Sequence, residues 1–132
     1  MGNVMVETYA PSDNEAYMND LQIEYFKNKL ILEKMASDQK LKQHLGKIKN
    51  RKSQHADILD KSNFLMDLEW EISTYERYNQ RIRQINKALD RIDSGRFGYC
   101  EITGEPIGLK RLETLPFTHL SMEALTENET WQ

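Results

Sequence analysis

The feature that most constrains this chain is the scarcity of helix-breaking residues between positions 12 and 94. No proline lies in that interval, and Gly46 is its only glycine. A proline in a helix interior costs about 3 kcal/mol and a glycine about 1 kcal/mol relative to alanine, so such a stretch is typical of helix rather than of loop or sheet. We therefore predict a long helical region, followed from Gly95 onward by a compact, turn-rich unit.

A cluster of turn-forming and helix-capping residues divides the helical region in two. It comprises Ser53, Asp57, Asp60, Ser62 and Asn63. These residue types favour caps and turns, so we place a reversal between residues 58 and 59, with residue i facing residue 117 − i. With arms of roughly 30 to 35 residues, each rising about 1.5 Å, the hairpin would extend about 45 to 50 Å.

The apolar residues are consistent with this register. The second arm carries large apolar side chains at steps of three and four, as one face of an amphipathic helix does. They are Leu65, Leu68, Ile72, Tyr75, Tyr78, Ile82, Ile85, Leu89 and Ile92. The expected partners are Leu45 with Ile72, Ile48 with Leu68, Met35 with Ile82, Leu32 with Ile85 and Tyr25 with Ile92. The predicted fold class is therefore mostly α, with a long antiparallel coiled-coil hairpin.

Charge supports the same pairing. Residues 39–56 contain lysines and arginines and no acid, whereas residues 57–76 contain acids and Lys61 as their only base. Exposed ion pairs contribute about 0.2 to 1 kcal/mol each, so we interpret this match as a device that fixes register. A nucleic-acid contact by the basic run is the alternative that the sequence leaves open.

Composition excludes several classes of protein. The 18 Lys and Arg against 21 Asp and Glu give a net charge of −3, which does not favour a dedicated nucleic-acid or membrane-surface binder. Cys100 is the single cysteine and no long apolar run is present, so we expect no internal disulfide, no membrane contact and a cytoplasmic location. No Ser/His/Asp set or phosphate loop is present, and we predict that the chain is not an enzyme.

The turn-rich unit has the outline of a zinc knuckle. Cysteines at 100, 103, 121 and 124 would form C-x2-C-x17-C-x2-C, but the chain has Cys100, Thr103, Ser121 and Ala124. Structural zinc is held by four Cys or His ligands, so we predict no bound metal. The expected substitutes are hydroxyl hydrogen bonds from Thr103 and Ser121, docked N-terminal residues around Tyr17 and Met18, and apolar contacts among Phe97, Tyr99, Ile102, Ile107, Leu112, Leu120 and Met122.

Several stretches together resemble the DksA/TraR family. They are E-A-Y-M-N-D-L-Q from Glu15 onward, D-I-L-D-K-S at 57–62, and F-G-Y-C-E, G-E-P-I, R-L-E and Pro116 after Gly95. The resemblance implies a coiled-coil hairpin on a base built from both chain ends. We accordingly assign residues 1–18 to a segment packing on the base, 19–94 to the hairpin with its tip at about 55–63, and 95–132 to the degenerate zinc-finger-like region.

The resemblance also implies a function. Members of the family insert the hairpin into the secondary channel of bacterial RNA polymerase, where tip aspartates act near the catalytic centre and alter the lifetime of the open complex. Asp57 and Asp60 match those aspartates, while Ser62 replaces the alanine of the family motif. We expect a monomer whose partner is RNA polymerase, without sequence-specific DNA binding.

The alarmone ppGpp enhances the effect in the family, and the resemblance places its contacts on basic residues. Arg77 and Arg111 match such positions, but Gln84 and Leu125 stand where lysines are typical. A polyphosphate is held by Lys and Arg charge, so we expect a weakened ppGpp response.

Two other classes of protein remain as alternatives. A Gre-type factor would present the tip acids to a catalytic Mg²⁺ and promote transcript cleavage, and a structural coiled coil would bind an unrelated partner. We interpret His44 and His55 as solvated histidines and Cys100 as a small buried residue rather than a redox sensor. We interpret Trp70 as a packing residue, with a contact to polymerase as the alternative.

Overall fold

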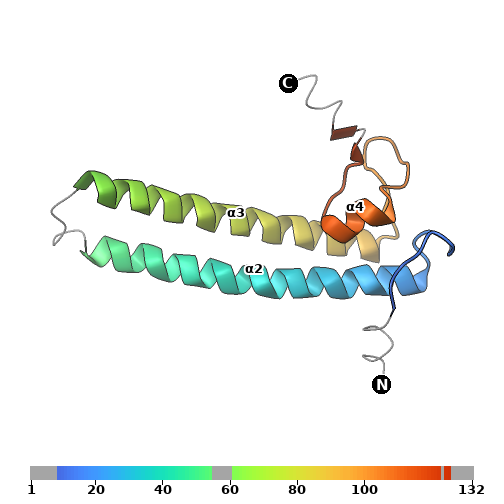
Figure 1. Ribbon diagram of the computed structural model, residues 1–132, viewed down its shortest axis with the longest axis horizontal. Coiled ribbons are helices and arrows are strands. Elements are labelled where there is room, and N and C mark those ends of the chain that lie inside the picture. Colours follow the sequence, from blue (N-terminus) through green and yellow to red (C-terminus); the bar gives the residue numbers. More distant parts are fainter. Residues whose placement is uncertain (1–8, 55–60, 123, 126–132) are drawn as a thin grey trace. The chain divides into compact units, whose positions relative to one another are not determined.

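The part of the chain that the structure describes contains two long helices and one short one. The computed structural model describes residues 9–54, 61–122 and 124–125. Its helices are α2 at Asp20–Gln54, α3 at Lys61–Asp93 and α4 at Leu109–Thr114 (Figure 1). The predicted mostly helical class with two long helices is confirmed. The expected reversal between residues 58 and 59 lies outside the described residues.

The chain divides into two compact units, which we call the terminal unit and the central unit. The terminal unit comprises Met1–Leu32 and Gln84–Gln132, and the central unit comprises Glu33–Arg83. Both α2 and α3 therefore contribute a segment to each unit. The predicted boundaries at residues 18 and 94 stay a prediction.

Local hydrogen bonds fix the start of α2. Oδ1 of Asn19 accepts the backbone N–H of Gln22 at 3.0 Å, and Oε1 of Gln22 accepts the backbone N–H of Met18 at 2.8 Å. The first bond satisfies an N–H group that has no partner within the first helical turn, which is why Asn and Gln at this spacing start a helix. Gln22 is buried, so the cap is also part of the core.

The core of the terminal unit joins α2, α3, α4, the segment before α2 and the segment between α3 and α4. Its buried apolar side chains are Met18, Phe26, Leu30, Ile85, Ala88, Phe97 and Leu112. The rings of Phe26 and Phe97 lie 5.9 Å apart between centroids. Burying a Leu, Ile or Phe side chain contributes about 1.5 to 3 kcal/mol, so this cluster is the main apolar contribution to the stability of the unit.

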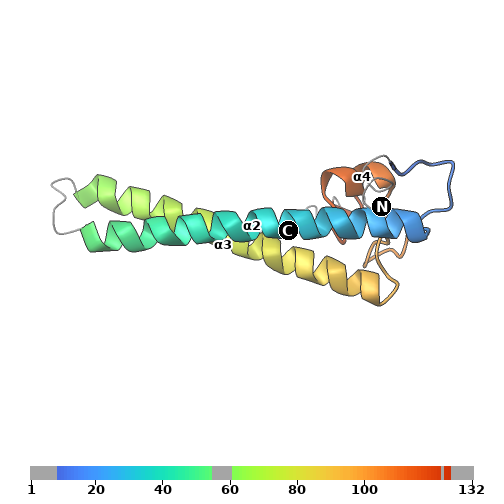
Figure 2. The ribbon, with the colours of Figure 1, turned by 90° about the horizontal axis from the view of Figure 1, so that it is seen from below.

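In the central unit the two arms lie side by side and antiparallel (Figures 1 and 2). Apolar Ile48 and Phe64 are buried there, and so are four polar residues, which are Ser37, His44, Glu71 and Thr74. We call these four residues the polar seam. Ser37 and His44 are seven residues apart, which is one heptad, so both lie on the same face of α2. That face turns toward α3 even where its side chains are polar.

The pairing in the polar seam differs from the predicted register. His44 contacts Glu71, whereas the expected rule would have placed it opposite Ser73. Apolar residues at three expected contact positions are instead exposed, with fractions of 65% for Leu32, 63% for Met35 and 49% for Leu65. The prediction failed at these positions because it counted apolar residues alone and overlooked the polar ones that face inward.

In the described part of the chain, no helix combines the length and the apolar character needed to cross a bilayer.

Candidate functional site

The knuckle, residues 97–108, is a loop closed by backbone hydrogen bonds. An isolated antiparallel bridge joins Tyr99 to Pro106. Next to it the N–H of Cys100 donates to the carbonyl of Glu105 at 2.8 Å, and the N–H of Ile107 donates to the carbonyl of Gly98 at 2.8 Å. These bonds satisfy the backbone without a sheet.

The segment before α2 closes the open end of the knuckle. The hydroxyl of Tyr17 donates to the carbonyl of Gly98 at 2.7 Å and accepts the N–H of Gly108 at 2.9 Å. Gly98 has φ +93, and a Cβ there would lie 2.6 Å from Cγ and Sδ of Met18. Only glycine allows both this backbone conformation and this close approach. The predicted docking of Tyr17 and Met18 is confirmed.

The four positions at which a zinc knuckle would carry its ligands lie close together. Cys100 is 2% exposed, and burial alone would raise the pKa of its thiol. Hydrogen bonds from Thr103 and Ser121 to the sulfur outweigh this effect and lower the pKa to about 6. Oγ of Ser121 also accepts the N–H of Ala124 at 3.1 Å, and Ala124 is buried.

This donor set does not fit a structural zinc ion. It offers one thiol, two hydroxyls and a methyl group, whereas such sites use four thiolates or imidazoles. Across residues 9–54, 61–122 and 124–125, no three or more His, Cys, Asp or Glu side chains gather as a metal site would require.

Apolar packing of the knuckle follows the prediction only in part. Phe97 and Leu112 are buried, and Ile107 packs against the core. Ile102, at 55% exposed, and Met122, at 58%, face solvent instead, because backbone hydrogen bonds and the Tyr17 phenol close the loop without them.

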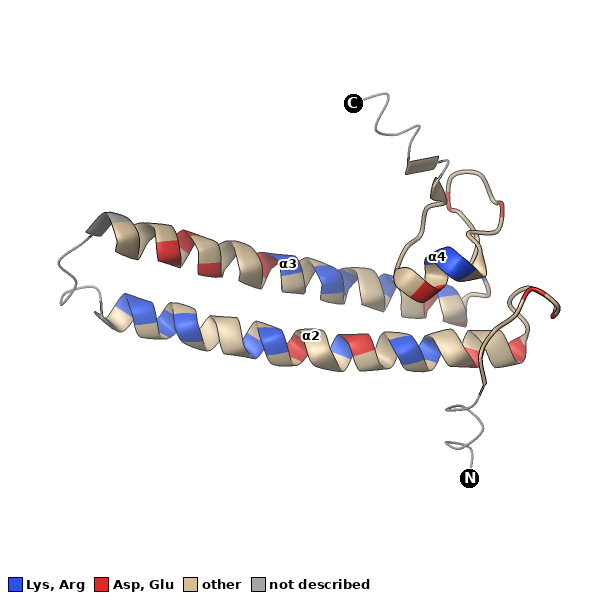
Figure 3. Ribbon diagram, in the orientation of Figure 1, with Lys and Arg blue, Asp and Glu red and all other residues tan. Residues whose placement is uncertain are grey.

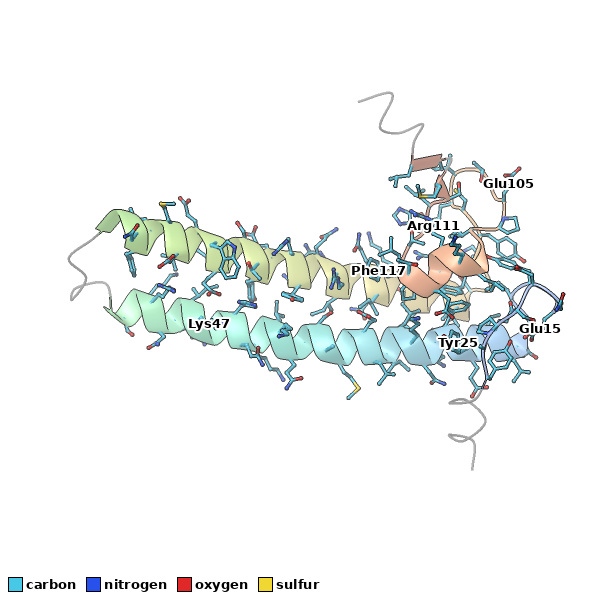
Figure 4. The ribbon with its side chains drawn as sticks, in the orientation of Figure 1. Glu15, Tyr25, Lys47, Glu105, Arg111 and Phe117 are labelled. Atoms are coloured by element: carbon cyan, nitrogen blue, oxygen red, sulfur yellow. The ribbon has the colours of Figure 1, made fainter. Side chains whose placement is uncertain are left out.

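Arg111 anchors the chain that follows α4. Its Nε donates to the carbonyl of Leu120 at 2.9 Å, and its Nη2 donates to Oγ1 of Thr118 at 3.3 Å. Figure 4 shows Arg111 on α4 and Phe117 on the segment after it. The guanidinium expected to contact ppGpp is therefore engaged by its own chain in this conformation.

Arg91 on α3 contacts the same segment and is only 5% exposed. It reaches the carbonyls of Phe117 and Thr118, at 3.4 and 3.5 Å, and its Nη1 lies 3.6 Å from a carboxylate oxygen of Glu101. Burial lowers the pKa of Arg91. This contact joins α3 both to the knuckle and to the segment after α4.

A polar cluster joins α4 to α2. Nζ of Lys29 donates to Oε2 of Glu113 at 2.7 Å, and Tyr25 also bonds the Glu113 carboxylate. Burial, the hydrogen bond to Glu113 and its negative charge together raise the pKa of Tyr25 to about 12. For Glu113, burial acts to raise the pKa, but the bonds from Lys29 and Tyr25 and the Lys29 charge lower it.

The polar seam of the central unit holds an acid–histidine pair. Nδ1 of His44 lies 2.7 Å from Oε2 of Glu71, and the His44 ring stacks on Tyr78 with centroids 5.7 Å apart. Both members of the pair are buried. The interpretation of His44 as a solvated histidine was wrong, since the inward turn of α2 places it opposite Glu71. His55 lies outside the described residues.

Charge is distributed unequally over the two arms of the central unit. Toward the ends of the arms α2 carries Lys and Arg and α3 carries Asp and Glu (Figure 3). Arg51 joins the two sets, with Nη1 3.3 Å from Oδ2 of Asp67. This pair agrees with the predicted charge match.

Most of the residues expected at the tip are not among those that the structure describes. Asp57 and Asp60 lie outside the described residues, and Ser62 is in the first turn of α3 but its side chain is not among those described. Arg77 lies exposed on α3, where it lines a hollow of about 130 Å³ with Tyr78 and Arg81.

Together, these features define a protein of two long paired helices with a knuckle of zinc-finger outline. The prokaryotic dksA/traR C4-type zinc finger family matches residues 95–129. The RNA polymerase-binding transcription factor DksA of Caulobacter vibrioides is 40% identical over 96% of this chain and 90% of its own length. The protein of the same name in Salmonella typhimurium is 27% identical over 92% of this chain and 80% of its own length.

A solved structure extends the likeness to the whole fold. Transcription factor DksA2 from Pseudomonas aeruginosa matches with a TM-score of 0.80 at 26% identity, over 98% of this chain and 97% of that one. The chain belongs to the DksA/TraR family.

Sequence reasoning missed the bond of Tyr17 to Gly98 and Gly108, the His44–Glu71 pair and the Lys29–Glu113 pair. One signal for the second was available, because Leu30, Ser37 and His44 follow one another at heptad spacing. No local pattern marks the other two, which join segments far apart in the chain.

Proposed function

We propose that this chain is a non-enzymatic transcription regulator that binds bacterial RNA polymerase and acts in the cytoplasm. The observation that carries the proposal is the 40% identity to an RNA polymerase-binding transcription factor over 96% of the chain. That match spans nearly the whole chain, the two arms as well as the knuckle, which supports a likeness beyond the knuckle alone.

In this proposal the arms act as a positioning device and the tip is the effector. The hairpin enters the secondary channel, and Asp57 and Asp60 act close to the catalytic centre to change open-complex stability. Two carboxylates there would alter the local field felt by Mg²⁺ and by phosphates, which carry the largest charges in such a site. The Ser62 hydroxyl in place of a methyl group adjusts the strength of this effect.

A ppGpp contact is the second element of the proposal. Arg77 is exposed on α3, and Arg111 would have to exchange its bonds to the segment after α4 for phosphate oxygens. Gln84 and Leu125 contribute no positive charge. We therefore propose that ppGpp enhances the activity only weakly. The Gln84→Lys, Leu125→Lys double variant should increase that enhancement.

The test is promoter-specific transcription in vitro with purified RNA polymerase, run with and without ppGpp. We expect the protein to change transcript yield from promoters with short-lived open complexes, as a monomer and without binding the promoter DNA itself. A parallel assay on stalled elongation complexes separates this function from that of a Gre-type factor, which would shorten the transcript. No effect on any promoter, together with no binding to polymerase, would favour a structural coiled coil.

A further inference from the structure

The first turns of α3 expose their large apolar side chains and bury polar ones. Met66 is 66% exposed and Trp70 58% exposed, whereas Glu71 and Thr74 are each only 4% exposed. Trp70 therefore packs only in part, with its ring in a T-shaped arrangement with that of His44 and the centroids 6.2 Å apart.

Stability of the isolated hairpin does not account for this arrangement. Burying a large apolar side chain contributes about 1.5 to 3 kcal/mol, whereas a buried carboxylate must be compensated by a partner. Met66 and Trp70 are four positions apart, so they lie on the same face of the helix and form one surface. We call this surface the outer patch. An exposed apolar surface of this kind is characteristic of an interaction site.

Position along α3 indicates where the outer patch would act. Met66 and Trp70 lie within about 14 Å of the start of α3, at about 1.5 Å per residue. Covalent continuity therefore requires that, if the tip enters a channel, the outer patch enters with it. Glu69 is exposed between Met66 and Trp70 in the sequence, while the exposed Asp67 pairs with Arg51, so a complementary surface would be apolar with a basic rim opposite Glu69.

We infer that the outer patch docks into an apolar recess with a basic rim on the channel wall of RNA polymerase, beside the point that the tip reaches. This inference rests on the proposed function. Contact there would fix the depth and rotation of the hairpin, and so the position of the tip acids.

Exposed methionines on the two arms provide a matched pair of variants. Met66→Glu places a charge in the outer patch, while Met35→Glu places the same charge on α2 at a side chain of similar exposure, 63%. Met35 lies about 28 Å along the axis from the end of α2, well away from the tip. Neither change adds a charge to the buried seam, so both variants should fold.

The measurement is the dissociation constant of the full chain for purified core RNA polymerase. Loss of a central apolar contact commonly reduces affinity by about tenfold or more, and we expect this for Met66→Glu, with Met35→Glu within about twofold of wild type. Trp70→Ala should weaken binding similarly and Trp70→Phe should restore most of it. A photo-crosslinking amino acid at position 66 should label a polymerase peptide that contains apolar and basic residues.

Three results would overturn the inference. The first is equal binding by wild type and Met66→Glu, and the second is equal weakening by Met35→Glu. The third is a wild-type dimer that Met66→Glu converts to monomer, which would assign the outer patch to a second copy of this chain. If wild type itself does not bind polymerase, the proposed function fails as well. If wild type binds polymerase and acts in transcription, and Met66→Glu does the same, the inference about the outer patch fails while the proposed function stands.

Discussion

Tyr17 and Gly98 lie 81 positions apart in the sequence, and the hydroxyl of Tyr17 donates a 2.7 Å hydrogen bond to the carbonyl oxygen of Gly98. The same hydroxyl accepts the N–H of Gly108 at 2.9 Å. One side chain from the segment before α2 therefore bonds backbone groups near both ends of the knuckle. The knuckle has no four-thiolate metal site, so these hydrogen bonds help to hold its two ends together.

Removing that hydroxyl should destabilise the terminal unit. Tyr17→Phe keeps the ring but leaves the half-buried N–H of Gly108 without its partner and removes one of the two hydrogen bonds to the Gly98 carbonyl, which should lower the free energy of unfolding by about 1 to 3 kcal/mol. Urea unfolding of the full chain measures it. Tyr99→Phe is the matched control, with an expected change within about 0.5 kcal/mol. Equal stability of the two variants would contradict the role assigned to Tyr17.

The His44–Glu71 pair should behave as a coupled unit. His44→Leu and Glu71→Leu each leave one member of the pair buried without its partner, and breaking such a pair costs about 3 to 5 kcal/mol. Replacing both residues by leucine should recover most of that loss, because an apolar pair needs no compensation. A double-mutant cycle followed by thermal unfolding measures the coupling. Additive effects of the two single substitutions would show that the residues do not act together.

Alkaline pH should weaken the contact between α4 and α2. Burial and Glu113 raise the pKa of Tyr25 from 10.0 to about 12, so the protonated phenol is favoured in the folded state. Its contribution is complete below pH 10 and is lost as the pH rises toward 12. Thermal melts across this range should show a shallower decline in Tyr25→Phe than in wild type. Some decline should remain in that variant, because the pKa of Tyr9 is also raised to about 12.

The opposite sign applies to Glu113 at acid pH. Its folded-state pKa lies below the ordinary value of 4.5, so its contribution is present above pH 4.5 and is lost as the pH falls through the lower value. Glu113→Gln should reduce this acid dependence. If stability falls at acid pH in that variant just as it does in wild type, the role assigned to the Lys29–Glu113 pair is contradicted.

Zinc should contribute nothing to stability. A structural zinc ion supplies about 10 to 16 kcal/mol in small peptides, but one thiol with Thr103, Ser121 and Ala124 cannot hold it. We expect no stoichiometric zinc by elemental analysis and an unchanged melting temperature in EDTA. Because the four positions already lie together, changing those three residues to cysteine should create zinc binding. Stoichiometric zinc in the wild-type protein would overturn this account.

The sequence predicted the features that depend on a pattern along the chain. The paired helices follow from the absence of proline, and the knuckle outline from the spacing of Cys100, Thr103, Ser121 and Ala124. It failed where a single contact outweighs the local pattern. His44 reads as a surface residue in a basic run, and only the facing Glu71 shows why it is buried.

The exposed side chains reveal a second limit. Met35 and Trp70 have the hydropathy of core residues, and a count of apolar positions assigns them inward. Helix rotation is set by the whole seam, including Ser37 and Thr74, so it cannot be obtained from apolar residues alone. Exposed apolar residues of this kind look the same in sequence as residues of the core.

The central claim is that the tip carries the effect on transcription while the arms carry the binding. The most direct measurement is open-complex lifetime on one promoter, with polymerase affinity determined on the same samples for wild type, Asp57→Asn and Asp60→Asn. Each variant removes a charge at nearly constant size, so we predict that the effect on lifetime is lost while affinity falls only slightly. Full activity in both variants, or loss of affinity in proportion to activity, would contradict the account.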